Sequence, residues 1–222
     1  MKSKILIGLT VCVVIAAAVF GLIKRQSYTD IVNKENFMEQ MVIAELSAKL
    51  TENVCTELFQ TLPTAPIILS VSPVEDMEYM FKTGRQKVCI HEVHMGDGLD
   101  VGQEIYVTFS SWSVILLEKY NTVQCGFVNT MKKDNEYLVF LSDKIDGLDN
   151  LMVYSLFGES VIAPIFCYEE LENVIAPTHG TTTYVTYSSV KNNEFFAETE
   201  EALRIWKGLK AEMLELYPME AN

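Results

Sequence analysis

The chain has 222 residues, and 49% of them are hydrophobic, which is enough to bury a core in one or two domains. Its formal net charge is −13. Residues 1–25 hold four of the 17 basic side chains and no acidic one, so residues 26–222 carry 13 basic against 30 acidic groups, a net −17. A surface of this sign repels nucleic-acid phosphates and anionic lipid headgroups, which excludes nucleic acid as a partner.

An uncharged apolar run, Ile5–Ile23, follows two lysines at the N-terminus. As a helix it would extend about 28 Å, close to the thickness of the bilayer core. Two interpretations are open: a signal peptide cleaved near Ala16–Ala18, or a retained anchor that uses the whole run. We favour a single-pass anchor over residues 1–25, because the run stays apolar beyond Ala18. The lysines of the short head favour a cytoplasmic N-terminus, which would place residues 26–222 outside the cytoplasm.

Residues 26–62 contain no glycine or proline and are rich in helix formers, so we expect a helical stalk or linker there. An apolar residue recurs at every fourth position, which predicts one apolar face on one helix or on two helical pieces. That face packs either on the protein's own domain or, over residues 35–60, against a partner chain. The recurring positions are Met38, Val42, Leu46, Leu50, Val54 and Leu58.

A pair of strands within Gln86–Phe109 organises residues 63–192. Val88–Met95 and Glu104–Phe109 both alternate in polarity, and a glycine-rich acidic turn lies between them. Ser110–Cys125 is predicted to form a short helix or a loop. Further strands are expected at Pro66–Ser72, Met77–Phe81, Glu136–Leu141, Leu151–Leu156, Ser160–Cys167 and Thr181–Tyr187.

Residues 193–222 are predicted to hold a C-terminal amphipathic helix. Thr199 can cap its N-terminus, and Pro218 stops it. Gly208 costs up to about 1 kcal/mol against alanine inside a helix, which suggests close packing at that position. The apolar stripe consists of Ala202, Trp206, Leu209, Met213 and Leu216.

Four cysteines lie beyond the predicted anchor: Cys55, Cys89, Cys125 and Cys167. Their spacing matches no disulfide framework. Two of them lie in apolar strand-like runs, where a cysteine usually packs as a small hydrophobic residue. Buried thiols are therefore the favoured interpretation, with a disulfide as the alternative.

The sequence contains three histidines and no complete catalytic or metal-binding motif. His91 and His94 resemble the zinc-protease pattern HExxH, but they are spaced by three, and a strand would point them to opposite faces. The acids of Asp143–Asp149 lack the spacing of a calcium-binding loop. His179 lies in a loop without an identifiable nucleophile. We therefore predict no catalytic, cofactor-binding or metal-binding residues, and no cofactor.

Trp112 and Tyr120 are the candidate partner-binding residues. Both lie in or beside the segment predicted as a helix or a loop. Aromatic side chains exposed in such a segment can form an apolar patch for a partner, and Trp112 is the better candidate for exposure.

Three short motifs carry a resemblance to a known family. They are Val88–Val93 with the following Gly96–Asp97, Val101–Ile105, and Asn135–Leu141. In this order they resemble netrin-like, OB-type β-barrel domains, including those of bacterial membrane-anchored surface proteins of unknown function, over Pro66–Cys167. The tissue inhibitors of metalloproteinases share this fold, but their N-terminal cysteine and dense disulfide set have no counterpart here. The resemblance therefore implies the barrel and not protease inhibition.

These features predict a mainly β protein of the α+β class, with flanking helices. We expect an N-terminal transmembrane helix, a helical linker, an OB-like closed or partly open β-barrel and a C-terminal amphipathic helix. The expected function is a non-catalytic extracytoplasmic binding module, held in the cell membrane, whose partner is a cell-envelope protein. The alternatives are a hydrolase-type enzyme with a dispersed site near His179, or a structural envelope protein that pairs through residues 35–60.

Overall fold

The computed structural model describes residues 13–15, 17–22, 37–80, 83–116, 121–146, 151–158, 160–176 and 184–219. The chain divides into two compact units, residues 1–37 and residues 38–222. In the first unit the described residues are helical. Among the described helices, none combines the length and the apolar character that a membrane crossing requires. The predicted anchor helix over residues 5–23 lies partly outside the described residues, so it stays a prediction.

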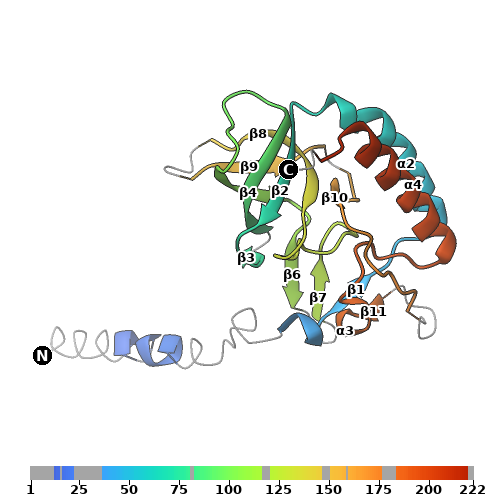
Figure 1. Ribbon diagram of the computed structural model, residues 1–222. Helices are drawn as coiled ribbons and strands as arrows, with labels where there is room; N and C mark the ends of the chain where they lie inside the picture. The colour runs from blue at the N-terminus through green and yellow to red at the C-terminus, as the bar shows by residue number, and fades with distance from the viewer. Residues whose placement is uncertain are drawn as a thin grey trace, which may run out of the picture. The chain divides into compact units, whose positions relative to one another are not determined.

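Five strands of the second unit form a closed barrel (Figure 1). They are β2 (Ile67–Pro73), β4 (Thr83–Met95), β5 (Glu104–Phe109), β8 (Tyr137–Lys144) and β9 (Val153–Leu156). The order is β8-β2-β4-β5-β9, and β9 pairs back onto β8. The β5–β9 pair is parallel and the other pairs are antiparallel. This closed five-stranded barrel is compatible with an OB-like fold and confirms the expected barrel.

The two strands predicted within Gln86–Phe109 form and pair with each other, as β4 and β5. β4 and β5 pair from Gly84 opposite Phe109 to Cys89 opposite Glu104. Ile90, Ile105 and Val107 are completely buried. The strands form because β-branched residues at every second position can face one core. Two short strands extend the barrel sheet: β3 (Glu78–Met80) pairs with β4, and β10 (Ile165–Cys167) pairs with β8.

A second sheet has the order β11-β1-β7-β6. Its strands are β11 (Tyr184–Thr186), β1 (Val42–Ala44), β7 (Asn121–Gln124) and β6 (Ser113–Leu116). The prediction of helix at Val42–Ala44 is wrong, because β1 pairs on one side with β11 and on the other with β7. The helix or loop predicted for Ser110–Cys125 is also wrong, because that segment supplies the β6–β7 pair. In both places tertiary strand pairing overrides local preference.

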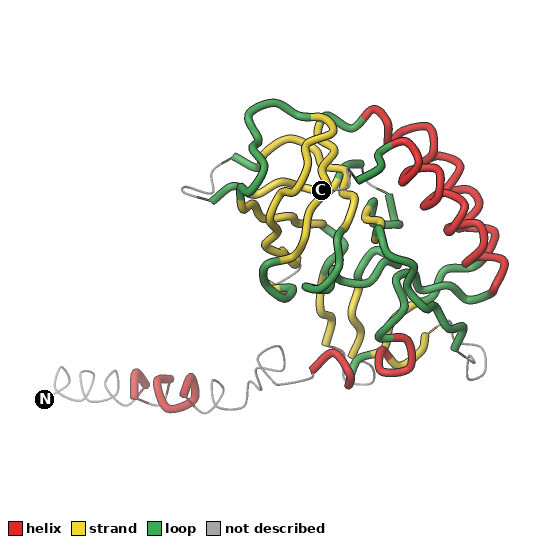
Figure 2. Tube along the Cα trace, viewed as in Figure 1, coloured by secondary structure: helices red, strands yellow, loops and turns green. Residues whose placement is uncertain are grey.

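Two longer helices lie side by side on one flank of the barrel (Figures 1 and 2). They are α2 (Ala48–Thr61) and α4 (Glu200–Leu216). A parallel bridge between Leu46 and Ala197 precedes both helices, so they start together and run in the same direction. Short helical segments are also present: η1 (Phe37–Gln40), η2 (Leu62–Thr64) and α3 (Tyr187–Val190).

The C-terminal helix follows its sequence signals closely. The Thr199 side chain accepts a hydrogen bond from the backbone N–H of Ala202, so the predicted cap is confirmed. Trp206 packs between two phenylalanine rings, stacking on Phe195 at 4.9 Å and on Phe166 of β10 at 6.2 Å between ring centroids. This aromatic stack fastens α4 to the barrel. Of the predicted apolar stripe, the last member, Leu216, is exposed instead of buried.

The predicted apolar face of the first helix is partly wrong. The buried residues of α2 are Thr51, Cys55 and Leu58, whereas Leu50 is 54% exposed. The residues spaced by four do not form one helical face, because residues 42–44 belong to a strand and the helix begins only at Ala48. Leu58 of the predicted stripe packs on the domain.

Candidate functional site

A groove of about 500 Å³ runs between α2 and α4. Its lining residues recur about every fourth position on each helix, as expected for a furrow between two parallel helices. They are Glu52, Cys55, Thr56, Phe59 and Gln60 of α2, with Arg204, Ile205, Gly208, Leu209 and Glu212 of α4. The groove leaves no signal in the sequence, because no local pattern indicates which two helices will lie together.

Gly208 opens the groove. A Cβ atom at this position would meet no atom within 4 Å, and the residue is exposed. The close packing predicted for Gly208 is therefore wrong: the missing side chain leaves a hollow. The Phe59 ring borders the same groove and is 47% exposed. A hollow beside an exposed aromatic ring is a surface to which an apolar side chain of a partner can bind.

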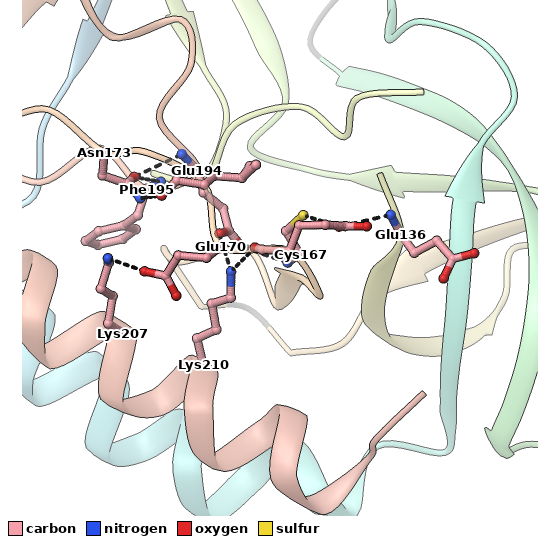
Figure 3. A network of polar contacts seen from close by, with 10 residues as sticks. Glu136, Cys167, Glu170, Asn173, Glu194, Phe195, Lys207 and Lys210 are labelled. Carbon is pink, nitrogen blue, oxygen red and sulfur yellow. Dashed lines mark hydrogen bonds and ion pairs between the residues drawn. The ribbon is translucent and has the colours of Figure 1, made fainter. Parts of the chain in front are cut away.

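A buried polar network lies between α4, β10 and the segment before α4, and Figure 3 shows its side chains. The Lys210 Nζ lies 2.6 Å from Oε2 of Glu194, and only 11% and 3% of the two side chains are exposed. The backbone N–H of Cys167 donates to the other Glu194 oxygen at 2.6 Å, and Lys210 also donates to the Glu169 carbonyl. Burial raises the pKa of Glu194, and the ammonium of Lys210 opposes that rise. The network joins α4, β10 and the chain segment before α4.

The amide of Asn173 extends this network. Its side-chain oxygen accepts the backbone N–H groups of Glu194 and Phe195 at 2.9 and 3.0 Å. A cavity of about 250 Å³ lies beside it, and the ammonium groups of Lys207 and Lys210 line this cavity. Each ammonium already has a carboxylate partner, at 2.7 Å for Lys207 with Glu170. The charged residues that line the cavity are therefore already paired with one another.

A serine, a histidine and a glutamate lie in the order of a hydrolase triad on β2 and β4. Ser70 Oγ lies 2.8 Å from Nε2 of His94, and Nδ1 of the same ring lies 3.5 Å from Oε1 of Glu92. However, Ser70 is completely buried, and its hydroxyl also bonds to that of Tyr168 at 2.7 Å. Because a substrate cannot reach a nucleophile with no exposed surface, we interpret this arrangement as structural.

The prediction that His91 and His94 point to opposite faces is wrong. β4 has one more residue than β2 between the Ser70 and Val71 pairings, which breaks the alternation. His91 bonds to Ser72 at 2.6 Å and His94 bonds to Ser70, and these serines share one face of β2. Within the described residues, no group of three or more His, Cys, Asp or Glu side chains could hold a metal ion.

Of the two predicted partner-binding residues, Trp112 lies within the described part of the structure. Trp112 is 1% exposed and packs edge-to-face on Phe109, with 6.0 Å between ring centroids. Its predicted exposure is therefore wrong, because β6 and β5 bring it into the core. Tyr120 lies outside the described residues, as do His179 and Asp149.

The four described cysteines are free thiols, and three of them are buried. Burial raises the pKa of Cys55, Cys125 and Cys167 to about 12 in each case. Such thiols stay protonated near neutral pH and make poor nucleophiles. The favoured interpretation of buried cysteines is confirmed for these three, and Cys89 is half-buried.

Glu45, between β1 and α2, is a buried acid that sequence analysis did not single out. It is 4% exposed, and neither carboxylate oxygen has a hydrogen-bond partner within the part of the chain that the structure describes. The pKa of Glu45 is raised from 4.5 to about 7, first by burial and second by the nearby carboxylate of Glu198. The Glu45 side chain therefore changes between its neutral and its charged form close to neutral pH.

We expect Glu45→Gln to stabilise the protein only at high pH. The folded state holds this proton more tightly than the unfolded chain, so wild-type stability falls as the pH rises from 4.5 to about 7. Denaturant unfolding should show the variant more stable by roughly 1–3 kcal/mol above the folded-state pKa, with no gap below the unfolded-state pKa. A gap for Glu45→Gln that does not vary with pH would contradict the assignment.

No family model and no curated protein matches the sequence. The fold alone therefore describes the class of this protein: an α+β domain with a closed five-stranded barrel, compatible with an OB-like fold, and a pair of parallel helices on its flank.

Proposed function

We propose that this protein is a membrane-anchored, extracytoplasmic interaction module without catalytic activity, and that it binds a protein of the cell envelope in the α2–α4 groove. The observation that carries this proposal is the groove itself, with the hollow at Gly208 beside the exposed ring of Phe59. Protein partners use such apolar hollows as anchor sites. The barrel then serves as the rigid scaffold that holds the two helices.

We further propose that the barrel is netrin-like. The motifs in Val88–Val93, Val101–Ile105 and Asn135–Leu141 support this assignment, because they fall on β4, just before and into β5, and into β8, respectively. The strand order of the barrel is consistent with it.

The two alternatives have less support. The hydrolase-type site expected near His179 lies outside the described residues, and the Ser–His–Glu arrangement that the structure does describe has a completely buried Ser70. A structural protein that pairs through residues 35–60 would need a free apolar stripe on that segment. Leu46 and Leu58 of the stripe are buried and Leu50 is 54% exposed, so the stripe is not one continuous free face.

Photo-crosslinking in intact cells tests the binding surface. Benzoylphenylalanine in place of Phe59 should give a discrete adduct with one envelope protein, and the added substitution Gly208→Leu should abolish it by filling the hollow. The same photoreactive residue in place of Val101, which is 68% exposed on the barrel, is the matched control. An adduct that persists in the Gly208→Leu background, or one shared by both positions, would overturn the proposal.

Protease treatment of intact cells tests the location. A C-terminal epitope tag should be lost from intact cells while a cytoplasmic marker survives. Protection of the tag until lysis would place the domain in the cytoplasm and contradict this part of the proposal.

A further inference from the structure

The charges around the α2–α4 groove indicate the chemistry of its partner, an inference that rests on the proposed function. The exposed charged residues of the two helices are two basic ones, Lys49 and Arg204, and six acidic ones, a net −4. The acidic residues are Glu52, Glu57, Glu200, Glu201, Glu212 and Glu215. Among the residues that line the groove, Glu52 and Glu212 outnumber Arg204, so a partner that binds here must complement a negative surface.

The fold itself removes basic charge from this surface. Helix α4 contains two lysines besides Arg204, and both pair within the protein: Lys207 with Glu170 at 2.7 Å and Lys210 with the buried Glu194 at 2.6 Å. Neither ammonium is left to balance the glutamates of the outer face. The acidity of the groove is thus a consequence of the network in Figure 3, as well as of composition.

The two helix dipoles strengthen the negative potential at one end of the groove. Because the helices are parallel, their C-terminal ends lie at the same end, where Glu57, Glu212 and Glu215 are also found. Neither helix has a basic residue in its last turn. Helix C-termini favour cations, so this end is suited to lysine or arginine side chains of a partner.

The shape of the groove favours a helix over other partners. Its lining from Glu52 to Gln60 extends about 12 Å along α2, which corresponds to roughly two turns of a helix. A third helix can pack into the furrow between two helices and place an apolar side chain in the hollow at Gly208. A second copy of the protein would place its own α2–α4 surface, with a net charge of −4, against an identical one, and the two would repel. Anionic lipids and nucleic acids would be repelled for the same reason.

We infer that the α2–α4 groove binds a basic amphipathic helix of its protein partner. An apolar residue of that helix occupies the hollow between Phe59 and Gly208. Its cationic residues lie over Glu52 and Glu212, which line the groove, and over the C-terminal ends of α2 and α4.

Synthetic peptides on the full chain test this inference. The protein is held in nanodiscs of zwitterionic lipid, and empty nanodiscs provide the blank. The probes are labelled helical peptides of about 18 residues, one of leucine and lysine and one of leucine and glutamate with identical leucine positions. Fluorescence anisotropy should show binding of the lysine peptide, weakened by salt, and no binding of the glutamate peptide.

Charge-reversal variants test whether the lysine peptide binds in the α2–α4 groove. The pair Glu52→Lys and Glu212→Lys should weaken binding of the lysine peptide by about tenfold or more, and Gly208→Leu should weaken it similarly. The matched pair Asp97→Lys and Asp100→Lys changes the net charge equally on the barrel and should change affinity by no more than about twofold. Gly208→Ala serves as the folding control, since its Cβ meets no atom within 4 Å and a helical alanine is favourable.

Equal losses in both charge-reversal pairs, or equal binding of both peptides, would overturn the inference. If the lysine peptide does not bind while the Phe59 adduct in cells still depends on Gly208, the charge inference fails and the proposed function survives. If a second copy of the chain is the crosslinked species, the inference also fails. The absence of any groove-dependent adduct would overturn the proposed function as well.

Discussion

Replacing Phe140 with alanine should lower the free energy of unfolding by about 3–5 kcal/mol. Phe140 lies in β8 and has no exposed surface. Its ring packs edge-to-face on Phe166 of β10 at 6.0 Å and on Tyr217, just after α4, at 5.7 Å. The deletion would leave a cavity where the barrel, β10 and the end of α4 meet. Rigid strands on both sides of β8 limit how far the site can collapse.

Denaturant titration and thermal melting would measure this loss, with a fall in Tm on the order of 10 °C for a domain of this size. Leu138→Ala, two residues earlier on the same strand and equally buried, should cost about 2–5 kcal/mol. Phe59→Ala is the control, because that ring is 47% exposed. Unchanged melting temperatures for both Leu138→Ala and Phe140→Ala would show that β8 is not part of the core.

Glu194→Ala should also destabilise the protein by about 3–5 kcal/mol. The substitution leaves the ammonium of Lys210 buried without its carboxylate, and it removes the acceptor of the Cys167 backbone N–H. An uncompensated buried charge costs more than the lost ion pair itself contributes. We expect α4 to loosen first, so binding at the groove should weaken along with stability.

A neighbouring ion pair, whose lysine also lies on α4, provides the matched control. Glu170 pairs with Lys207 at 2.7 Å, but its side chain is 81% exposed, so Glu170→Ala should cost no more than about 1 kcal/mol. Replacing both Glu194 and Lys210 with methionine should recover part of the loss, because no buried charge then remains unpaired. Equal costs for Glu170→Ala and Glu194→Ala would show that Lys210 is not buried in solution.

The buried acid–base pair illustrates a limit of sequence analysis. Lys210 falls on the apolar stripe of α4 between Trp206 and Met213, and this misplaced charge was the available signal that it needs a buried partner. Nothing in the sequence identified that partner as Glu194, because it lies in an irregular segment before the helix. Trp112 shows the opposite error, since an aromatic residue in a segment of unclear fold was expected at the surface and is buried.

The sequence by itself determined the main strands and the C-terminal helix. Alternation in Glu104–Phe109, the strand signal in Glu136–Leu141 and the cap at Thr199 are each encoded by a few adjacent residues, so local physics was sufficient. Only the tertiary structure decided that Val42–Ala44 is a strand, because its partners lie near residues 122 and 186. The same holds for the α2–α4 groove. It exists because a bridge between Leu46 and Ala197 aligns two helices that are distant in the chain, and no local pattern contains that contact.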